Sequence, residues 1–176
     1  NDQFAQFFGS ATPAIPDVTG GYFRANPGDG AGTPGELDID GSYSAYTRVN
    51  FDRHKLMYLY NKFEHKSGSQ DQRLTFLRLD SGGTMQLAVG DGLEGAEAVH
   101  TTTVLDPNIW YDIATSFDDA NDTGSIHIIN PDTRAIIDSA TGPLTLSPQE
   151  TDDPFLIGAR ENFGLAFEND FVEGKM

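Results

Sequence analysis

The sequence contains no cysteine, so disulfide bonds, thiolate metal sites and cysteine nucleophiles are excluded. It also has no apolar run long enough to span a bilayer. Positive charge is scarce, because 11 basic residues stand against 27 acidic ones and the formal net charge is −16. Nucleic acid is therefore a poor partner, since phosphate binding needs a basic surface. The 176 residues, 38% of them hydrophobic, are enough for one soluble domain with a buried core.

The N-terminal part of the chain is rich in turn-forming residues. It opens with NDQFAQFF, which has neither the basic start nor the apolar stretch of a secretory signal, so we expect a mature or an intracellular chain. Proline and glycine recur through residues 1–35 too often for a long helix. We expect residues 1–20 to form an N-terminal arm, with a short helix or arm near 2–8 and a strand near 21–25.

Aspartate outnumbers glutamate by 19 to 8, and most of the aspartates fall in segments that look like turns. Solubility or a salty medium explains most of them. Oxygen-rich loops can also bind Ca²⁺, which is the one cofactor that we expect, if there is any. The loop DDANDTG supplies the candidate ligands Asp118, Asp119, Asn121 and Asp122, although it does not match the EF-hand loop.

From residue 36 onward the apolar residues alternate with polar ones, as they do in half-buried β-strands. The clearest case is TMQLAV, in which Met85, Leu87 and Val89 share one face. Turns are expected at Asp80–Gly83, just before this strand, and at Asn130–Thr133. Short strands at regular spacing predict a sandwich or barrel. The expected strands are 43–51, 56–63, 73–79, 84–89, 97–104, 110–117, 124–129, 134–139 and 154–159.

Three segments, taken in their order, resemble the laminin-G-like domains of the concanavalin A-like lectin-glucanase superfamily. They are residues 76–92 (FLRLDSGGTMQLAVGDG), 105–138 and 155–162 (FLIGAREN). Within them the matching residues are Trp110, Ile113, Ala114, Phe117, Asp118, Leu156, Ile157 and Gly158. The resemblance covers about residues 35–175 and implies an all-β fold, a two-sheet antiparallel jelly-roll sandwich that occupies residues 1–176 as a single domain.

The chain departs from this family pattern at its C-terminal end. The segment FVEGKM (171–176) is usually followed in the family by one more strand, and here it is not. A missing strand leaves an unpaired sheet edge, which invites pairing with another chain. We expect the N-terminal arm, with Phe4, Phe7 and Phe8, to cover this edge. Self-association through the open edge is the alternative.

The basic residues concentrate in residues 48–78, which hold seven of the eleven. This window is net +4 and could receive an anionic ligand, although neighbours in sequence need not be neighbours in a sheet. Tyr58 and Tyr60 are candidate sugar-stacking residues, and a half-exposed sheet face explains them equally well. The candidate ligand-binding set is Tyr58, Tyr60, Lys62 and Arg78.

No convincing catalytic set is present. Glu36, Asp38 and Asp40 place three carboxylates on one strand face, as in related glucanases, but a turn of the family explains Asp40 and Gly41 better. The four histidines lack both a nucleophile motif and metal-ligand spacing. We assign no catalytic residue.

The core is predicted from alternation and, for Trp110, from the family match, which favours a packing role over sugar stacking. The residues expected to be mostly buried are Met85, Leu87, Val89, Trp110, Ile113, Phe117, Ile126, Ile128, Ile136 and Leu156.

The resemblance and the lack of a catalytic set favour a non-catalytic, extracellular or cell-surface module that binds a polysaccharide or glycan or acts in adhesion. Two alternatives stay open. One is a glycan-cleaving enzyme of the same superfamily, either a glycoside hydrolase or a polysaccharide lyase. The other is a structural subunit of an extracellular filament, coat or matrix.

Overall fold

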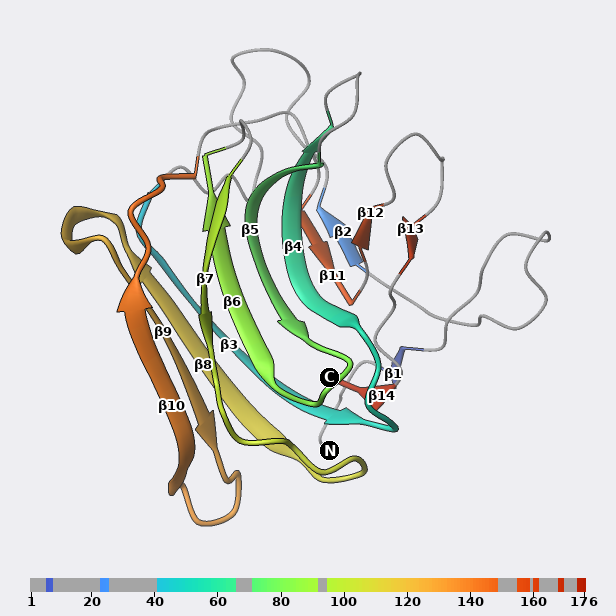
Figure 1. Ribbon diagram of the computed structural model, residues 1–176. Helices are drawn as coiled ribbons and strands as arrows, with labels where there is room; N and C mark the ends of the chain where they lie inside the picture. Colours follow the sequence, from blue (N-terminus) through green and yellow to red (C-terminus); the bar gives the residue numbers. More distant parts are fainter. Residues whose placement is uncertain are drawn as a thin grey trace.

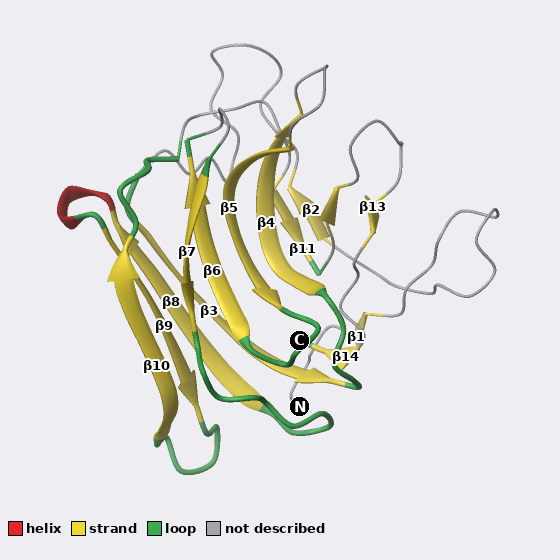
Figure 2. Cartoon of the chain, in the orientation of Figure 1, coloured by secondary structure: helices red, strands yellow, loops and turns green. Residues whose placement is uncertain are grey.

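The computed structural model describes residues 6–7, 23–25, 41–65, 71–91, 95–148, 155–158, 160–161, 168–169 and 174–176. In these residues strands dominate and two curved sheets face each other (Figure 1). The helical structure described is one short 3₁₀ turn, Asp119–Asn121, between two long strands (Figure 2). The expected all-β jelly-roll sandwich is confirmed.

Six strands form the first sheet, in the spatial order β1-β14-β3-β8-β9-β10. Their bounds are Gln6–Phe7 (β1), Gly174–Lys175 (β14), Tyr43–Phe51 (β3), Tyr111–Asp118 (β8), Thr123–Ile129 (β9) and Ile136–Pro143 (β10). The second sheet has the order β2-β11-β4-β5-β6-β7. Its strands are Phe23–Ala25 (β2), Phe155–Ile157 (β11), Met57–His65 (β4), Asp71–Leu79 (β5), Met85–Gly90 (β6) and Ala96–His100 (β7). Arg160–Glu161 (β12) pairs with Glu168–Asn169 (β13). Every pairing is antiparallel.

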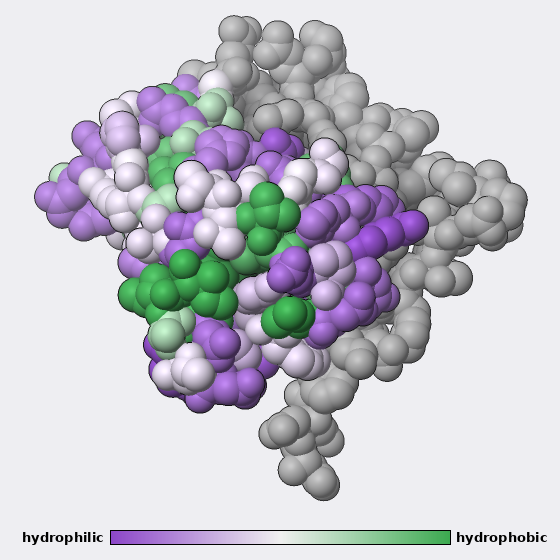
Figure 3. Space-filling view, turned by 60° about the horizontal axis from the view of Figure 1, so that its bottom comes forward, coloured by the Kyte–Doolittle hydropathy of each residue, from purple (hydrophilic) through white to green (hydrophobic). Residues whose placement is uncertain are grey.

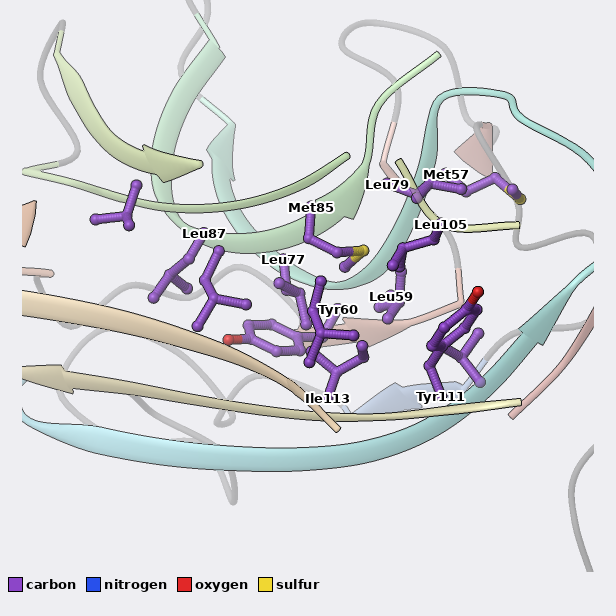
Figure 4. Packing of buried hydrophobic residues seen from close by; sticks show 14 of the residues in the cluster. Met57, Leu59, Tyr60, Leu77, Leu79, Met85, Leu87, Leu105, Tyr111 and Ile113 are labelled. Carbon is purple, nitrogen blue, oxygen red and sulfur yellow. The ribbon is translucent and has the colours of Figure 1, made fainter. Parts of the chain in front are cut away.

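The hydrophobic core fills the space between the two sheets (Figure 4). Each long strand contributes alternate residues, as period-two patterning requires. Most of the predicted core is confirmed as buried: Met85, Leu87, Val89, Ile113, Phe117, Ile126, Ile128 and Leu156. Two pairs of polar side chains inside this layer bond each other: the Tyr60 hydroxyl lies 2.9 Å from Thr115 Oγ1, and the Tyr43 hydroxyl bonds Thr75 Oγ1.

Two predicted core residues lie elsewhere. Ile136 is 62% exposed, because the pairing of β10 with β9 shifts between Ile136 and Asp138. This bulge reverses which residues of β10 face inward, so the alternation read from the sequence fails at that point. Trp110 is half-buried and lies just before β8.

Two turns confirm the sequence prediction and fix the ends of strands. Asp80 Oδ1 accepts hydrogen bonds from the backbone N–H groups of Gly82 and Thr84, at 2.8 and 3.0 Å. Gly83 in this turn has φ +87°, a region that favours glycine. Asn130 Oδ1 accepts from the N–H groups of Asp132 and Thr133 in the β9–β10 hairpin.

The N-terminal segment reaches the C-terminal strand. Gln6 pairs with Lys175 and Phe7 with Gly174, and β14 in turn pairs with the end of β3. This is the side of the sandwich at which the sequence predicts an uncovered edge. Phe4 and Phe8 lie outside the described residues, as do Glu36, Asp38 and Asp40 of the carboxylate-rich segment.

One end of the sandwich carries hydrophobic residues among hydrophilic ones (Figure 3). The 101–110 loop and the start of β10 lie at this end (Figure 1). Their exposed hydrophobic residues are Val104, Ile109, Ile136 and Ile137. Among the described residues, no helix is long and apolar enough to cross a membrane.

Candidate functional site

The ligand-binding set predicted from the sequence does not line an open groove. Tyr58 is 0%, Tyr60 5% and Lys62 2% exposed, so three of its four members are buried. The pairing of β4 with β5 shifts between Tyr58 and Tyr60, which places these two side chains in different clusters. The expectation that both tyrosines share one accessible face is therefore wrong, because a bulge breaks the alternation.

Tyr60 points into the core, where its ring stacks on Phe155 with centroids 5.7 Å apart. Burial there raises the pKa of Tyr60 well above its usual value. Tyr58 packs on the other face of β4 against Phe76, at 5.4 Å between ring centroids. Both tyrosines serve packing.

Arg78, the fourth predicted residue, is half-buried and covers this second cluster. Its guanidinium carbon lies 5.0 Å from the Phe76 ring centroid, and Nη1 donates to the Tyr58 hydroxyl at 3.0 Å. Its Nε donates to Gln86 Oε1 at 2.5 Å. These donors are engaged and the charge lies over an aromatic ring. Arg78 therefore covers the Tyr58–Phe76 pair and has a structural role.

The predicted calcium loop hydrogen-bonds to itself. Asp118 caps the 3₁₀ turn, with Oδ1 accepting from Asn121 N–H and Oδ2 from Asn121 Nδ2. Asp119 Oδ1 accepts from Ser147 Oγ. Asp122 is exposed and holds the left-handed conformation that ends the turn, with φ 51°. In the described part of the chain, no three His, Asp or Glu residues are grouped as metal ligands are. The carboxylate oxygens of Asp118 and Asp119 accept hydrogen bonds from protein groups and are not arranged around a common centre. Calcium binding stays a prediction.

The fold scatters the basic residues that the sequence concentrates in 48–78. Lys62 is buried in β4, and Arg78 lies on the second sheet. Arg48 lies on β3 of the first sheet, on the face that points away from the core. A positive site is nevertheless present around Arg48, built from residues of three separate segments.

Arg48 and Arg134 both bind the carboxylate of Asp112. Arg48 Nε lies 2.6 Å from Asp112 Oδ1 and its Nη2 lies 3.0 Å from Oδ2, so the contact is bidentate. Arg134 Nη1 donates to the same Oδ2 at 2.9 Å. The Asp112 side chain is 0% exposed, whereas the side chains of Arg48 and Arg134 are 46% and 68% exposed. Two guanidinium groups over one carboxylate leave one positive charge unneutralised.

The electrostatics of this cluster are coupled. The hydrogen bonds from Arg48 lower the pKa of Asp112 below its ordinary value, and a hydrogen bond from the Tyr46 phenol adds to the effect. The same carboxylate raises the pKa of Arg48. Asp112 is therefore ionised and both arginines are charged throughout the physiological pH range.

Local structure fixes each of these groups. Arg48 and Asp112 are directly opposite each other in the β3–β8 ladder. Arg134 has φ 62° in the β9–β10 hairpin, and its N–H donates to the Asn130 carbonyl at 2.9 Å. The hairpin therefore returns Arg134 to the beginning of β8, where Asp112 lies.

Beside the arginines, the outer face of the first sheet carries an aromatic ring. Tyr46 lies two residues before Arg48 on the same face and is 59% exposed. Its ladder partner is Ala114, whose own partner on the next strand is His127. A small residue thus separates two ring side chains. His127 Nδ1 is buried without a hydrogen-bond partner among the described residues. We call this set of residues the Asp112 face: Tyr46, Arg48, Asp112, Ala114, His127 and Arg134.

The sequence analysis missed Tyr46, Asp112 and Arg134 as site residues. Their sequence separations are large, since Arg48 and Asp112 are 64 residues apart. One local pattern pointed to this face. Tyr46 and Arg48 lie two residues apart in a strand, so both side chains face outward on the same side. Nothing in the sequence shows that a hairpin turn would bring Arg134 to the same carboxylate.

No protein-family model matches this sequence, and no curated protein matches it at the significance required. Solved structures do resemble the fold. A pentraxin of Limulus polyphemus is similar with a TM-score of 0.56 and 12% identity, over 97% of this chain and 70% of that one. The CBM40 of the Ruminococcus gnavus IT-sialidase reaches a TM-score of 0.60 at 12% identity, over 78% of this chain and 72% of that one.

Domains LG4–5 of the mouse laminin α1 chain are similar with a TM-score of 0.54 and 13% identity, over 98% of this chain and 39% of that one. These proteins share the concanavalin A-like jelly roll. The resemblance that the sequence predicts is confirmed at the level of the fold.

Proposed function

We propose that the protein is a non-catalytic carbohydrate-binding module that acts outside the cell or at its surface, and that it binds glycan at the Asp112 face. The observation that carries the proposal is Tyr46, an aromatic side chain 59% exposed on a sheet face beside two anchored arginines. An aromatic ring has a large apolar face and a polar tip, and Tyr46 presents both beside charged hydrogen-bond donors.

The chemistry of the face suits a sugar. One side of a pyranose ring presents C–H groups, which pack on an aromatic ring, while its hydroxyl groups need hydrogen-bond partners. Tyr46 supplies the ring, and Arg48 and Arg134 supply N–H donors beside it. Ala114 lies next to Tyr46 with only a methyl group, so no bulky neighbour blocks the sheet surface on that side.

The structural comparisons support this reading. The Ruminococcus gnavus CBM40 was solved bound to α2,3-sialyllactose, and a domain of the same fold can therefore be a carbohydrate-binding module. Function does not follow from fold alone, so the proposal depends on the site.

A glycan array tests the proposal with the wild-type protein, Tyr46→Ala and Ile109→Ala. Ile109 is the matched control, since it is 47% exposed but lies in the 101–110 loop. We expect glycan binding by the wild-type and Ile109→Ala proteins and a loss of about tenfold or more for Tyr46→Ala, as expected when one stacking residue is removed. Equal binding by Tyr46→Ala would place the site elsewhere. Release of new reducing ends from bound glycans would instead favour the glycan-cleaving enzyme.

A further inference from the structure

We infer that the Asp112 face selects acidic glycans, with a carboxylate or sulfate group of the sugar held by Arg48 and Arg134. The inference rests on the proposed function and adds the class of sugar to it. It depends on charge balance, on accessible donors and on prior ordering of both arginines.

The charge balance of the face is positive although the chain is strongly negative. Arg48 and Arg134 share Asp112 as their acidic partner among the described residues. The six residues of the Asp112 face therefore carry one positive charge in excess, which the exposed Asp132 of the β9–β10 hairpin opposes. The formal charge of the whole chain is −16, so an anion is repelled by most of the surface. Because screening limits such forces to about 8 Å at physiological salt, an anion is attracted only close to the arginines.

The arginines retain accessible donors. Among the described residues, the Arg134 side chain has one acceptor, Asp112, to which it donates through Nη1. The other N–H groups of Arg134 belong to a side chain that is 68% exposed. Arg48 bonds Asp112 through Nε and Nη2 and also contacts the Tyr46 phenol. Most of the accessible donors therefore belong to Arg134. A planar fork of N–H groups matches the geometry of a carboxylate or sulfate.

Contacts within the protein position both arginines in the absence of a ligand. Arg48 is held by the β3–β8 ladder and by its bidentate contact, and Arg134 by the Asn130 turn and the shared carboxylate. Binding therefore costs little side-chain ordering, which is a main cost of recognition by flexible cations. One arginine would be enough to neutralise the charge of Asp112 if the contact served stability alone.

One acidic residue opposes the site and provides a second test. Asp132 is exposed in the same hairpin, two residues before Arg134, and its backbone N–H, not its carboxylate, bonds Asn130. Its charge weakens the attraction for an anion. Replacing it with asparagine removes that charge without changing any contact of Asp112.

The experiment measures affinity for two matched pairs of polymers. The first pair is polygalacturonate and its methyl ester, and the second is heparin and desulfated heparin, so the pairs distinguish carboxylate from sulfate. The variants are Arg134→Asn, which suits the left-handed conformation at φ 62°, and Asp132→Asn. Arg53→Asn is the control with the same change in net charge, in the turn that follows β3.

We expect the wild type to prefer the acidic member of at least one pair, with affinity that falls as salt rises. Arg134→Asn should weaken that binding by about tenfold, Arg53→Asn should leave it nearly unchanged, and Asp132→Asn should tighten it. The Asp132 variant keeps the test decisive if Arg134→Asn fails to fold. Equal affinity for both members of each pair, or equal losses in the two arginine variants, overturns the inference and leaves the proposed function standing. Absence of binding to these polymers and to every glycan of the array overturns both.

Discussion

Arg134 Nη1 lies 2.9 Å from Asp112 Oδ2, and this contact joins the β9–β10 hairpin to the beginning of β8. The carboxylate also accepts from Arg48 on β3, so one buried side chain links three segments of the first sheet. The same contact sets the charge and shape of the proposed binding face. We therefore expect stability and the proposed glycan binding to be coupled at Asp112.

Asp112→Asn should lower the free energy of unfolding by about 1.5–3 kcal/mol, the range for hydrogen bonds to charged groups. The arginines are partly exposed and can return to water, which limits the loss. The pKa of Asp112 is lowered in the folded protein, so its contribution is present above the pKa of the unfolded chain and is lost as pH falls through the folded pKa. Urea unfolding from about pH 7 down to about pH 3 should show the two proteins converging in acid. A constant difference at all pH values would contradict this.

Gly124→Ala should destabilise the core by overpacking. A methyl group at this position would collide with Leu144 Cδ1 and lie 3.6 Å from Leu87 Cδ2. We expect a loss of about 1–3 kcal/mol in thermal unfolding, reduced when Leu144 is shortened to valine in the same protein. Gly41→Ala is the control, since nothing lies within 4 Å of its added methyl group, and it should be close to neutral. Equal effects at the two glycines would show that packing is not the cause.

Asp138 ties the 101–110 loop to β10. Its Oδ2 accepts from the N–H groups of Thr102 and Thr103 at 2.9 and 2.7 Å, and the Thr103 bond is the main cause of its lowered pKa. Asp138→Ala should speed hydrogen exchange at these two amides, with a loss of about 1 kcal/mol in stability. Asp138→Asn retains an acceptor oxygen and should show a smaller effect. Unchanged exchange in the alanine variant would mean that the loop is held by other contacts.

Deleting residues 1–10 removes β1 and leaves β14 paired with β3 alone. We expect the melting temperature to fall, by about 2–4 °C for each kcal/mol lost in a domain of this size. The uncovered edge should also promote self-association, which size-exclusion chromatography measures. A monomer of unchanged stability would show that β1 does not protect this edge.

Calcium binding by the 118–122 loop remains to be tested. A metal ion must displace the Asn121 bonds of Asp118, so we expect weak affinity, about 10⁻⁴ to 10⁻³ M. Added Ca²⁺ should then raise the melting temperature of chelator-treated protein by mass action. Asp119→Asn with Asp122→Asn should abolish the rise. If the wild-type melting curve does not move at any calcium concentration, the loop has a purely structural role.

The fold class and most of the core could be predicted from the sequence. Alternation placed Met85, Leu87 and Val89 on one buried face, and the expected strand 43–51 coincides with β3. These features depend on residues close together in the chain, where the two-residue period of a strand decides which side chains face inward. The turns at Asp80 and Asn130 were equally local, because each side chain bonds backbone groups a few residues away.

The residues of the proposed site could not be predicted from the sequence, because long-range pairing brings them together. The bulges in β4 and β10 reversed the alternation that had placed Tyr58 beside Tyr60 and Ile136 in the core. Register between distant strands brought Arg48 to Asp112 across 64 residues, and a left-handed residue in a hairpin turned Arg134 to the same carboxylate. Bulges and register are set by the packing of one sheet on another, which no window of neighbouring residues contains.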